Sequence, residues 1–215
     1  MGFFDWFKKR KAQPKETIKL QQTLQPQAVQ ARQEPSLQPQ ENENSPLPSE
    51  SQKPKEVFSH DKAEWQWDNA MEAYIAQYDL DEDWEPTEEE EDIIWSYAGL
   101  HIEMFLAWVI KHGLLSDFHM EDDADEVAAV AGEEVSVHSF FVELCDCTLS
   151  RDDVAEQLYG FLDAYYPTYI TEFTEWLEKV RNKPALGTAF DWADYHAFEP
   201  VLDVAYRKYL EENHA

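Results

Sequence analysis

Apolar residues recur at intervals of three and four from about residue 60 onward, which is the period of an amphipathic helix. An acidic pair three residues apart, Asp61 and Glu64, has the pattern of a capping box at the start of a helix. The apolar stripe that follows shares one helical face and consists of Trp67, Met71, Tyr74, Ile75 and Tyr78. We therefore expect a first helix that is capped at Asp61 and carries this stripe.

A second capping box, Thr87 with Glu90, precedes the most apolar stretch of the chain. Acidic residues 88–92 would lie at the positive end of the next helix, and Gly113 suits its C-terminal end. Residues 93–110 are apolar almost all round. Their length would suffice for a membrane span, but the internal His and Glu favour the central buried helix of a bundle.

Four further helical stretches follow. Residues 137–144 form a short one, and Ser150 with Asp153 caps the next. Pro167 is expected to end that helix, and Pro200 to stand in the first turn of the last one. No segment shows the alternating pattern of a strand. The sequence therefore predicts an all-α fold, a compact bundle of five to seven helices behind a disordered N-terminal arm.

Composition divides the chain into three parts. Residues 12–57 are rich in Gln, Pro, Ser and Glu and contain no aromatic residue, so they bury too little apolar area to offset their ordering entropy. We expect a disordered linker there. Residues 58–215 form the acidic helical domain, and residues 1–11 form a short amphipathic segment with both basic and aromatic side chains.

The N-terminal segment combines four aromatic side chains with the cations Lys8–Lys11; the aromatic residues are Phe3, Phe4, Trp6 and Phe7. Such a segment can lie in a membrane interface or dock in a groove, but two helical turns bury little area. We expect weak membrane contact at most. An apolar run followed by cations reverses the order of a signal peptide, so the expected location is the cytoplasm.

Charge is distributed unevenly along the chain. The formal net charge is −28, but residues 1–55 hold nine basic against six acidic residues, whereas residues 56–215 hold eight against 39. A body with a balance of −31 repels nucleic acid and anionic lipid, which both need cationic contacts. It attracts basic protein surfaces, so we expect a basic protein partner and no nucleic acid. The alternative is that the charge serves solubility alone.

The two cysteines, Cys145 and Cys147, stand one residue apart and make no disulfide framework. With His119 and His138 they include the ligand types that zinc takes, but their spacing matches no familiar Cys/His framework. We therefore expect no metal and no cofactor.

His101 and Glu103 have the His-x-Glu spacing of zinc deaminases, whose metal site also needs a Pro-Cys-x-x-Cys that is missing from this sequence. Two residues apart on a helix, their side chains point about 200° apart. We expect a buried, hydrogen-bonded His101. No nucleophile elbow, phosphate loop or dinucleotide fingerprint occurs, so no catalytic residue is assigned and a non-enzymatic protein is expected.

An acidic run between the first two expected helices is similar to the calcium-binding loop of an EF-hand. Positions 1, 3, 5 and 12 of such a loop are acidic here, namely Asp79, Asp81, Asp83 and Glu90. Position 6, which should be Gly for the sharp turn, is Trp84. The alternative is an ordinary acidic connection between helices.

The segment 101–116 resembles the signature of a bacterial family of unknown function, whose members typically show a Thr-His-Ile-Gly-Met-Phe-Leu-Ala-Trp run. The resemblance covers about residues 78–175. Two positions depart from it, because Leu100 stands in place of the Thr and Glu103 in place of the Gly. Later features of the family would correspond to Phe141, Asp146, Leu149 and Tyr165-Tyr166.

The resemblance implies no activity and no active site. It is associated with toxin–immunity gene neighbourhoods, which implies an immunity-type role. The residues that this chain shares with the signature are interpreted as a packing signature and are His101, Met104, Phe105 and Trp108.

Three functional hypotheses remain. The first is a non-enzymatic cytoplasmic protein-binding module that neutralises a basic partner, as an immunity protein does. The second is a membrane-tethered adaptor that acts through Phe3–Lys11. The third is a calcium-responsive module or an enzyme that uses the acidic loop.

Overall fold

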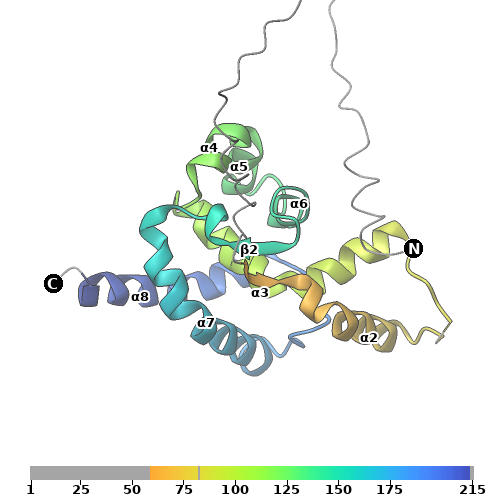
Figure 1. Cartoon of the computed structure of the whole chain (residues 1–215). Helices are drawn as coiled ribbons and strands as arrows, with labels where there is room; N and C mark the ends of the chain where they lie inside the picture. Colours follow the sequence, from red (N-terminus) through yellow and green to blue (C-terminus); the bar gives the residue numbers. More distant parts are fainter. Residues whose placement is uncertain (1–58, 82, 214–215) are drawn as a thin grey trace, which may run out of the picture. The chain divides into compact units, whose positions relative to one another are not determined.

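The computed structural model describes residues 59–81 and 83–213. This part of the chain folds into seven α-helices with little strand, which confirms the all-α prediction (Figure 1). The helices are α2 (Trp67–Tyr78), α3 (Glu88–Lys111), α4 (Asp117–Asp122), α5 (Ala124–Ala131), α6 (Val137–Glu143), α7 (Tyr159–Lys179) and α8 (Trp192–Asn213). The strands are β1 (Ser59–Lys62) and β2 (Thr148–Ser150), and the 3-10 helices are η1 (Ala63–Gln66), η2 (Arg151–Asp153) and η3 (Glu156–Leu158).

α3 starts at the predicted capping box. Thr87 Oγ1 accepts a hydrogen bond from the backbone N–H of Glu90 at 3.4 Å, and Glu90 Oε2 accepts one from the N–H of Thr87 at 2.8 Å. The helix ends at Lys111, and Gly113 adopts a left-handed conformation with φ 63°. Both ends of this helix are therefore set by local signals in the sequence.

α3 is the central helix of the domain. Every residue from Ile94 to Ile110 is buried except His101. By length and composition α3 is apolar enough to cross a membrane, but 89% of the apolar window is covered by the rest of the protein. This burial is what a helix needs when it is hydrophobic all round and forms the core of a helical domain.

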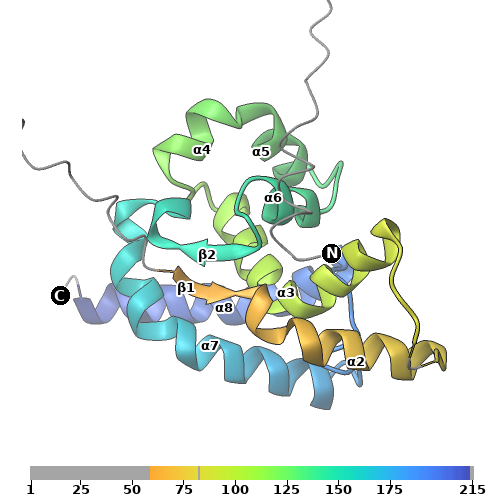
Figure 2. The same cartoon turned by 45° about the vertical axis from the view of Figure 1, so that its right-hand side comes forward.

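The other helices surround α3. α5 and α6 contact it on one side and α7 and α8 on the other, while α2 and η1 pack along its N-terminal half (Figure 2). α6 packs closely on α3 at Gly99, where a Cβ atom would overlap the ring of Phe141 in α6. The absence of a side chain at Gly99 therefore lets α6 approach the central helix.

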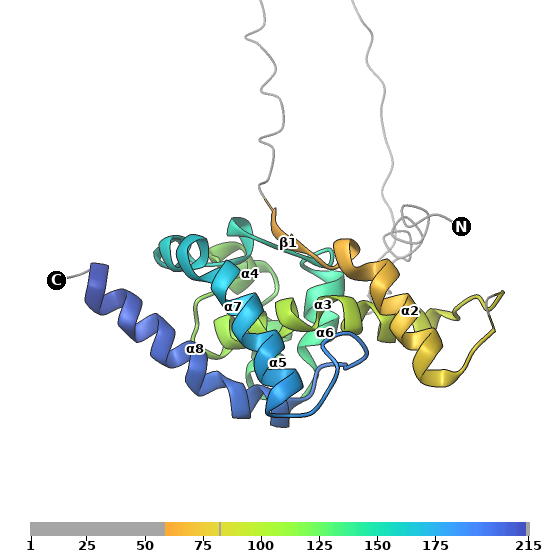
Figure 3. The same cartoon turned by 90° about the horizontal axis from the view of Figure 1, so that it is seen from below.

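α7 and α8 form an antiparallel pair that is held together by aromatic rings (Figure 3). Near one end, Phe161 of α7 lies 5.0 Å from Tyr206 of α8 between ring centroids, in an edge-to-face arrangement. Near the other end, Phe173 and Phe198 lie 5.3 Å apart in the same arrangement. Aromatic pairs of this geometry add to the stabilisation that comes from burying their surface.

Two prolines lie inside these helices, so two predictions are wrong. Pro167 does not end a helix but stands in the middle of α7, and Pro200 does not open the last helix but stands in the middle of α8. A proline removes one helical hydrogen bond, at a cost of about 3 kcal/mol. Both prolines are exposed, so water can bond the freed carbonyl groups. The apolar contacts on the opposite face of each helix offset the cost.

A small antiparallel sheet was not predicted. β1 pairs with β2, and Asp61 stands opposite Leu149. Strands of three or four residues are too short for an alternating pattern to stand out. Because Asp61 belongs to a strand, it does not cap the first helix, and η1 begins after Lys62 without a side-chain cap. The predicted capping box of Asp61 with Glu64 is therefore wrong.

The capping box of Ser150 with Asp153 is present, but it caps the 3-10 helix η2 and not a long helix. α7 begins only at Tyr159, after a second 3-10 turn. The predictions for residues 1–11, including the membrane contact through Phe3, Phe4, Trp6 and Phe7, and for the linker of residues 12–57, fall on positions outside the described residues.

Candidate functional site

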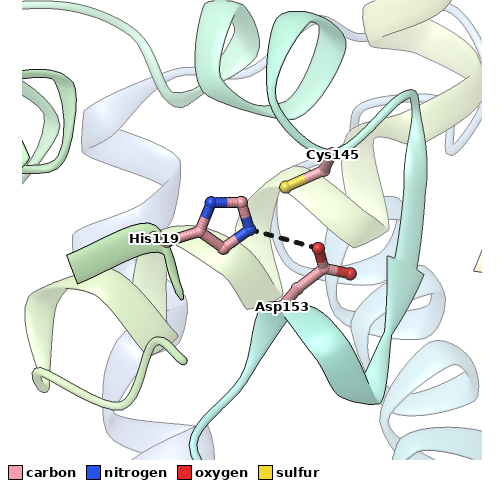
Figure 4. A group of neighbouring side chains, drawn as sticks. All are labelled: His119, Cys145 and Asp153. Atoms are coloured by element: carbon pink, nitrogen blue, oxygen red, sulfur yellow. Dashed lines mark hydrogen bonds and ion pairs between the residues drawn. The ribbon is translucent and has the colours of Figure 1, made fainter. Parts of the chain in front are cut away.

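A histidine, a cysteine and an aspartate meet in the interior, where α4 packs against η2 (Figure 4). His119 comes from α4, Cys145 from the turn between α6 and β2, and Asp153 from the last position of η2. One nitrogen, the sulfur and one carboxylate oxygen lie within 4.8 Å of one another. Their exposed fractions are 1%, 4% and 7%. We call these three residues the His119 cluster.

Local structure fixes the Asp153 carboxylate. Its Oδ2 accepts hydrogen bonds from the N–H of Ser150 at 2.6 Å and from the hydroxyl of Ser150 at 2.9 Å. The capping box therefore leaves Oδ1 to face His119. The backbone N–H of Ser116 donates to the carbonyl of Asp153 at 3.2 Å, which ties the start of α4 to η2.

His119 lies between two carboxylates. Its Nδ1 is 2.9 Å from Asp123 Oδ2, and its Nε2 is 3.3 Å from Asp153 Oδ1. The ring also packs against Phe140, with 5.0 Å between ring centroids. Burial disfavours the protonated form, but the hydrogen bonds and charges of the two carboxylates outweigh it and raise the pKa of His119.

Cys145 is not an activated nucleophile. Burial, followed by the charge and hydrogen bond of Asp153, raises the pKa of its thiol well above the ordinary value of 9.0. Reactive cysteines need the opposite shift, which a positive environment and partial exposure provide. What the cluster offers is three different donor atoms, a nitrogen, a sulfur and an oxygen, which are the ligand types that transition metals bind.

The sequence pointed to part of this cluster. Of the four residues considered as zinc ligands, His119 and Cys145 are brought together, whereas His138 and Cys147 are not part of the group. Asp153 is not predictable as a partner of His119 from the sequence, because its pattern with Ser150 indicates a helix cap. The capping pattern was correct, but it accounts for only one carboxylate oxygen of Asp153; the other faces His119.

A second buried cluster surrounds His101. Its Nε2 lies 2.9 Å from Asp61 Oδ2, and the hydroxyl of Tyr166 donates to the same oxygen at 3.2 Å. Asp61 Oδ1 accepts a hydrogen bond from the N–H of Lys62 at 2.8 Å. Burial would raise the pKa of Asp61, but the bonds and charge of His101, together with those of Lys62 and Tyr166, hold it below 3.8. We call Asp61, His101 and Tyr166 the His101 cluster.

Glu103 faces a different element from His101. Its Oε1 lies 2.6 Å from Nδ1 of His138 in α6, and its Oε2 accepts a hydrogen bond from Ser96 at 3.0 Å. His101 and Glu103 therefore point to opposite sides of α3, as two positions that are two residues apart on a helix must. They do not share a ligand.

The residues of α3 that follow His101 and Glu103 lie in the core. Met104, Phe105 and Trp108 are each 1% exposed or less. The indole N–H of Trp108 donates to Asp203 of α8 at 2.9 Å, and the ring of Phe105 meets Tyr166 of α7 edge to face at 5.2 Å. Trp108 and Phe105 therefore connect α3 to the two C-terminal helices.

The acidic loop between α2 and α3 does not gather its carboxylates. Asp79 follows α2 in a left-handed conformation with φ 52°, while Glu90 Oε2 accepts both hydrogen bonds from Thr87. No three of Asp79, Asp81, Asp83 and Glu90 form a close ligand group in the described part of the chain. Calcium binding at this loop stays a prediction.

An open groove of about 920 Å³ lies between α2 and the loop before α8. Ala73, Ala76, Leu186 and Phe190 contribute to its walls, and none of its polar side chains is buried. It lacks the converging, desolvated polar groups that a specific small-molecule site needs. The His119 cluster is therefore the stronger candidate site.

Comparison with known proteins gives a family without a known role. No curated protein matches the chain, and no solved structure matches it. Residues 61–185 match a domain of unknown function, DUF7832. The matched range contains the whole His119 cluster and ends before α8, although α8 packs on α3 and α7. Because this match covers more than half of its residues, the chain belongs to the DUF7832 family.

Proposed function

We propose that this protein is a non-enzymatic protein-binding module that captures a basic partner through α4 and α5. The observation that carries the proposal is an exposed apolar pair within a stretch that has no lysine or arginine. We call this surface the α4–α5 face and define it by its exposed residues, Asp117, Phe118, Met120, Glu121, Asp122, Asp125 and Glu126.

Cations are almost absent from this half of the domain. Between Lys62 and Arg151 the sequence holds a single lysine or arginine, Lys111. Its ammonium group is already engaged, because it donates to the carbonyl of Ala131 at 3.0 Å and to Glu133 at 2.7 Å. The carboxylates of the α4–α5 face therefore have no basic neighbour from this stretch, and their field would speed the association of a positive protein.

Apolar side chains give this face a means of tight contact. Phe118 is 60% exposed and Met120 is 46% exposed, on either side of the buried His119. Protein interfaces concentrate their binding energy in a few aromatic and other apolar anchors that are surrounded by polar residues. Carboxylates around Phe118 and Met120 match a partner surface with an apolar depression and a basic rim.

The face is held on a fixed element. His119 lies between Phe118 and Met120 and is bound on both ring nitrogens, so the short helix α4 is anchored from the inside. An anchor of this kind lowers the ordering cost of binding. Neutralisation of a toxin by an immunity-type protein in the cytoplasm is the form of this function that the sequence resemblance favours.

The test compares three versions of the full chain as baits. One is unchanged, one carries Glu121→Lys and Asp122→Lys on the α4–α5 face, and the control carries Glu178→Lys and Glu211→Lys on α7 and α8. All four positions are exposed, so the two variants change the net charge equally. Proteins are recovered from the source cell extract and identified by mass spectrometry, and the affinity of the purified partner is then measured.

The proposal expects a basic partner that the unchanged and control baits recover and the α4–α5 variant does not. Raising the salt concentration from 50 to 200 mM should weaken its affinity by about tenfold or more, because long-range attraction is screened. Equal recovery by both variants would overturn the assignment of the face. An affinity that is indifferent to salt, or a partner without basic character, would overturn the proposal itself.

A further inference from the structure

We propose that the His119 cluster is a zinc site, with His119 Nε2, Cys145 Sγ and Asp153 Oδ1 as its three protein ligands. Nothing in the family match assigns a ligand to these residues. The inference rests on the separation of the donor atoms, on the groups that orient them and on their chemistry. It does not depend on the partner proposed above.

The separation of nitrogen and oxygen fits a tetrahedral ion as well as it fits a long hydrogen bond. Zinc binds imidazole nitrogen and carboxylate oxygen at about 2.0–2.2 Å, so a tetrahedral angle places these two atoms about 3.3 Å apart. The observed distance from His119 Nε2 to Asp153 Oδ1 is 3.3 Å. Hydrogen bonds between nitrogen and oxygen usually fall at about 2.7–3.2 Å. The sulfur of Cys145 completes a triangle with no side longer than 4.8 Å.

Each of two ligands is oriented by a separate partner. His119 Nδ1 lies 2.9 Å from Asp123 Oδ2, so this carboxylate can hold the imidazole with Nε2 directed at the metal. Metal-bound histidines almost always make such a bond through the other ring nitrogen. Ser150 holds the second oxygen of Asp153 through two hydrogen bonds. The arrangement therefore supplies both a ligand set and the supporting contacts that metal sites use.

The donor set selects the metal by chemical class. A thiolate and an imidazole favour zinc over calcium and magnesium, which take oxygen ligands. Binding releases the protons of the Cys145 thiol and of His119 Nε2 to solvent, and three protein ligands leave a fourth position for water or an exogenous ligand. Ser116 stands one turn before His119 in the sequence. Its hydroxyl is buried and makes no hydrogen bond within the described residues.

A metal here would join three short segments that are distant in sequence. α4, the turn after α6 and η2 each provide one ligand, and His119 and Asp153 are 34 residues apart. α4 has only six residues, which is too short for a helix to be stable without tertiary contacts. Zinc would therefore hold α4 on the domain, because the free energy of metal binding adds to that of folding.

The experiment uses the full chain, stripped of metal with a chelator and kept reduced. Co²⁺ replaces Zn²⁺ as a spectroscopic probe, and Zn²⁺ affinity is measured by competition with a coloured chelator. The variants are Cys145→Ser and the matched control Cys147→Ser, since both thiols are buried and two residues apart. The stripped unchanged protein should bind one equivalent of Co²⁺ with tetrahedral absorption bands and one sulfur-to-metal charge-transfer band, and Zn²⁺ should displace it.

Cys145→Ser should abolish the charge-transfer band and weaken Zn²⁺ binding by about 100-fold or more, because it removes a direct ligand, whereas Cys147→Ser should leave affinity within about threefold. Circular dichroism shows whether each variant is folded. If Cys145→Ser does not fold, the spectrum of the unchanged protein still decides, because a bound ion without a sulfur band overturns the site. Absence of stoichiometric binding, or equal loss in both variants, also overturns it and leaves a metal-free hydrogen-bonded cluster.

Discussion

The His101 cluster and the His119 cluster contain similar residues but differ in the donor atoms that they leave available to a ligand. Each described histidine lies beside a carboxylate, and the carboxylates of Asp61 and Asp153 in these two clusters are buried. In the His101 cluster the carboxylate of Asp61 accepts bonds from a histidine, a tyrosine and a backbone N–H. In the His119 cluster a thiol stands where the other has a tyrosine hydroxyl.

This difference separates a structural network from a candidate ligand site. Every oxygen of Asp61 has a donor at hydrogen-bonding distance, and the cluster ties β1 to α3 and α7. In the His119 cluster the distance from His119 to Asp153 is longer, and the third donor is sulfur. A satisfied buried network stabilises the fold, whereas mixed donors at slightly longer distances suit a metal ion.

The largest effect is expected for Asp61→Asn. Loss of the Asp61 carboxylate should lower the free energy of unfolding by about 3 kcal/mol, because this buried group accepts hydrogen bonds from His101, Tyr166 and the N–H of Lys62. Urea unfolding at pH 7 measures this change. The control is Asp163→Asn, which removes a carboxylate that pairs with His60 and Arg151 but is 41% exposed and should cost at most about 1 kcal/mol. Similar losses in both variants would contradict the structural role of the His101 cluster.

The lowered pKa of Asp61 predicts how the difference in stability between the unchanged protein and Asp61→Asn changes with pH. The folded protein holds the pKa of Asp61 below its ordinary value of 3.8, so the unfolded chain takes up the proton first as pH falls. The stabilisation by Asp61 is therefore complete above pH 3.8 and is lost as pH falls through the folded pKa. We expect the gap in stability between the unchanged protein and Asp61→Asn to narrow below pH 4 (about the unfolded pKa) in urea titrations. A gap that stays constant down to acid unfolding would contradict this assignment.

Zinc should stabilise the protein through the other cluster alone. At a free Zn²⁺ concentration 100 times the dissociation constant, the free energy of unfolding should rise by about 2.7 kcal/mol. Asp61→Asn should keep this increment, and Cys145→Ser should lose it. Thermal and urea unfolding with and without Zn²⁺ measure both. An increment that is lost in Asp61→Asn would mean that the two clusters do not act separately.

Asp123→Asn should have a smaller effect on stability. This carboxylate is 17% exposed and contacts only the outer nitrogen of His119, so its loss should cost about 1.5 kcal/mol in urea unfolding without metal. Because it orients a proposed ligand, the substitution should also weaken Zn²⁺ binding by about tenfold or more. A stability loss with unchanged Zn²⁺ affinity would show that Asp123 does not serve the metal.

The smallest effect on stability is expected for Phe118→Ser on the α4–α5 face. Phe118 is 60% exposed, so unfolding in urea should change by no more than about 0.5 kcal/mol. Binding to the basic partner should nevertheless fall by about tenfold or more, because an apolar anchor is lost. A large loss of stability would mean that Phe118 serves the fold and not the surface.

Much of the helical framework could be predicted from the sequence. The capping box at Thr87, the stop at Gly113 and the apolar run between them define α3, and each depends on residues within a few turns of one another. The location of the capping box at Ser150 was also correct, although the helix it caps is short. Patterns of this kind work because helix geometry is set by contacts between near neighbours.

The candidate site depended on tertiary structure. Asp61 has the local pattern of a helix cap, but its partner Tyr166 lies 105 residues away, and pairing with β2 removes Asp61 from the helix. Asp153 also has a local capping pattern, and this pattern does not indicate that its Oδ1 faces His119, which is 34 residues away in the sequence. Pro167 and Pro200 show that packing on one face can outweigh a local break on the other.

Charge, helix ends and the apolar period were therefore determined by the sequence alone, because each is a property of a residue and its immediate neighbours. Which histidine meets which carboxylate, and whether a thiol stands beside them, was decided only when α4, η2 and the turn after α6 were brought together around α3. Donor atoms within a few ångströms of one another are a consequence of how distant segments pack, and no short-range pattern encodes that distance.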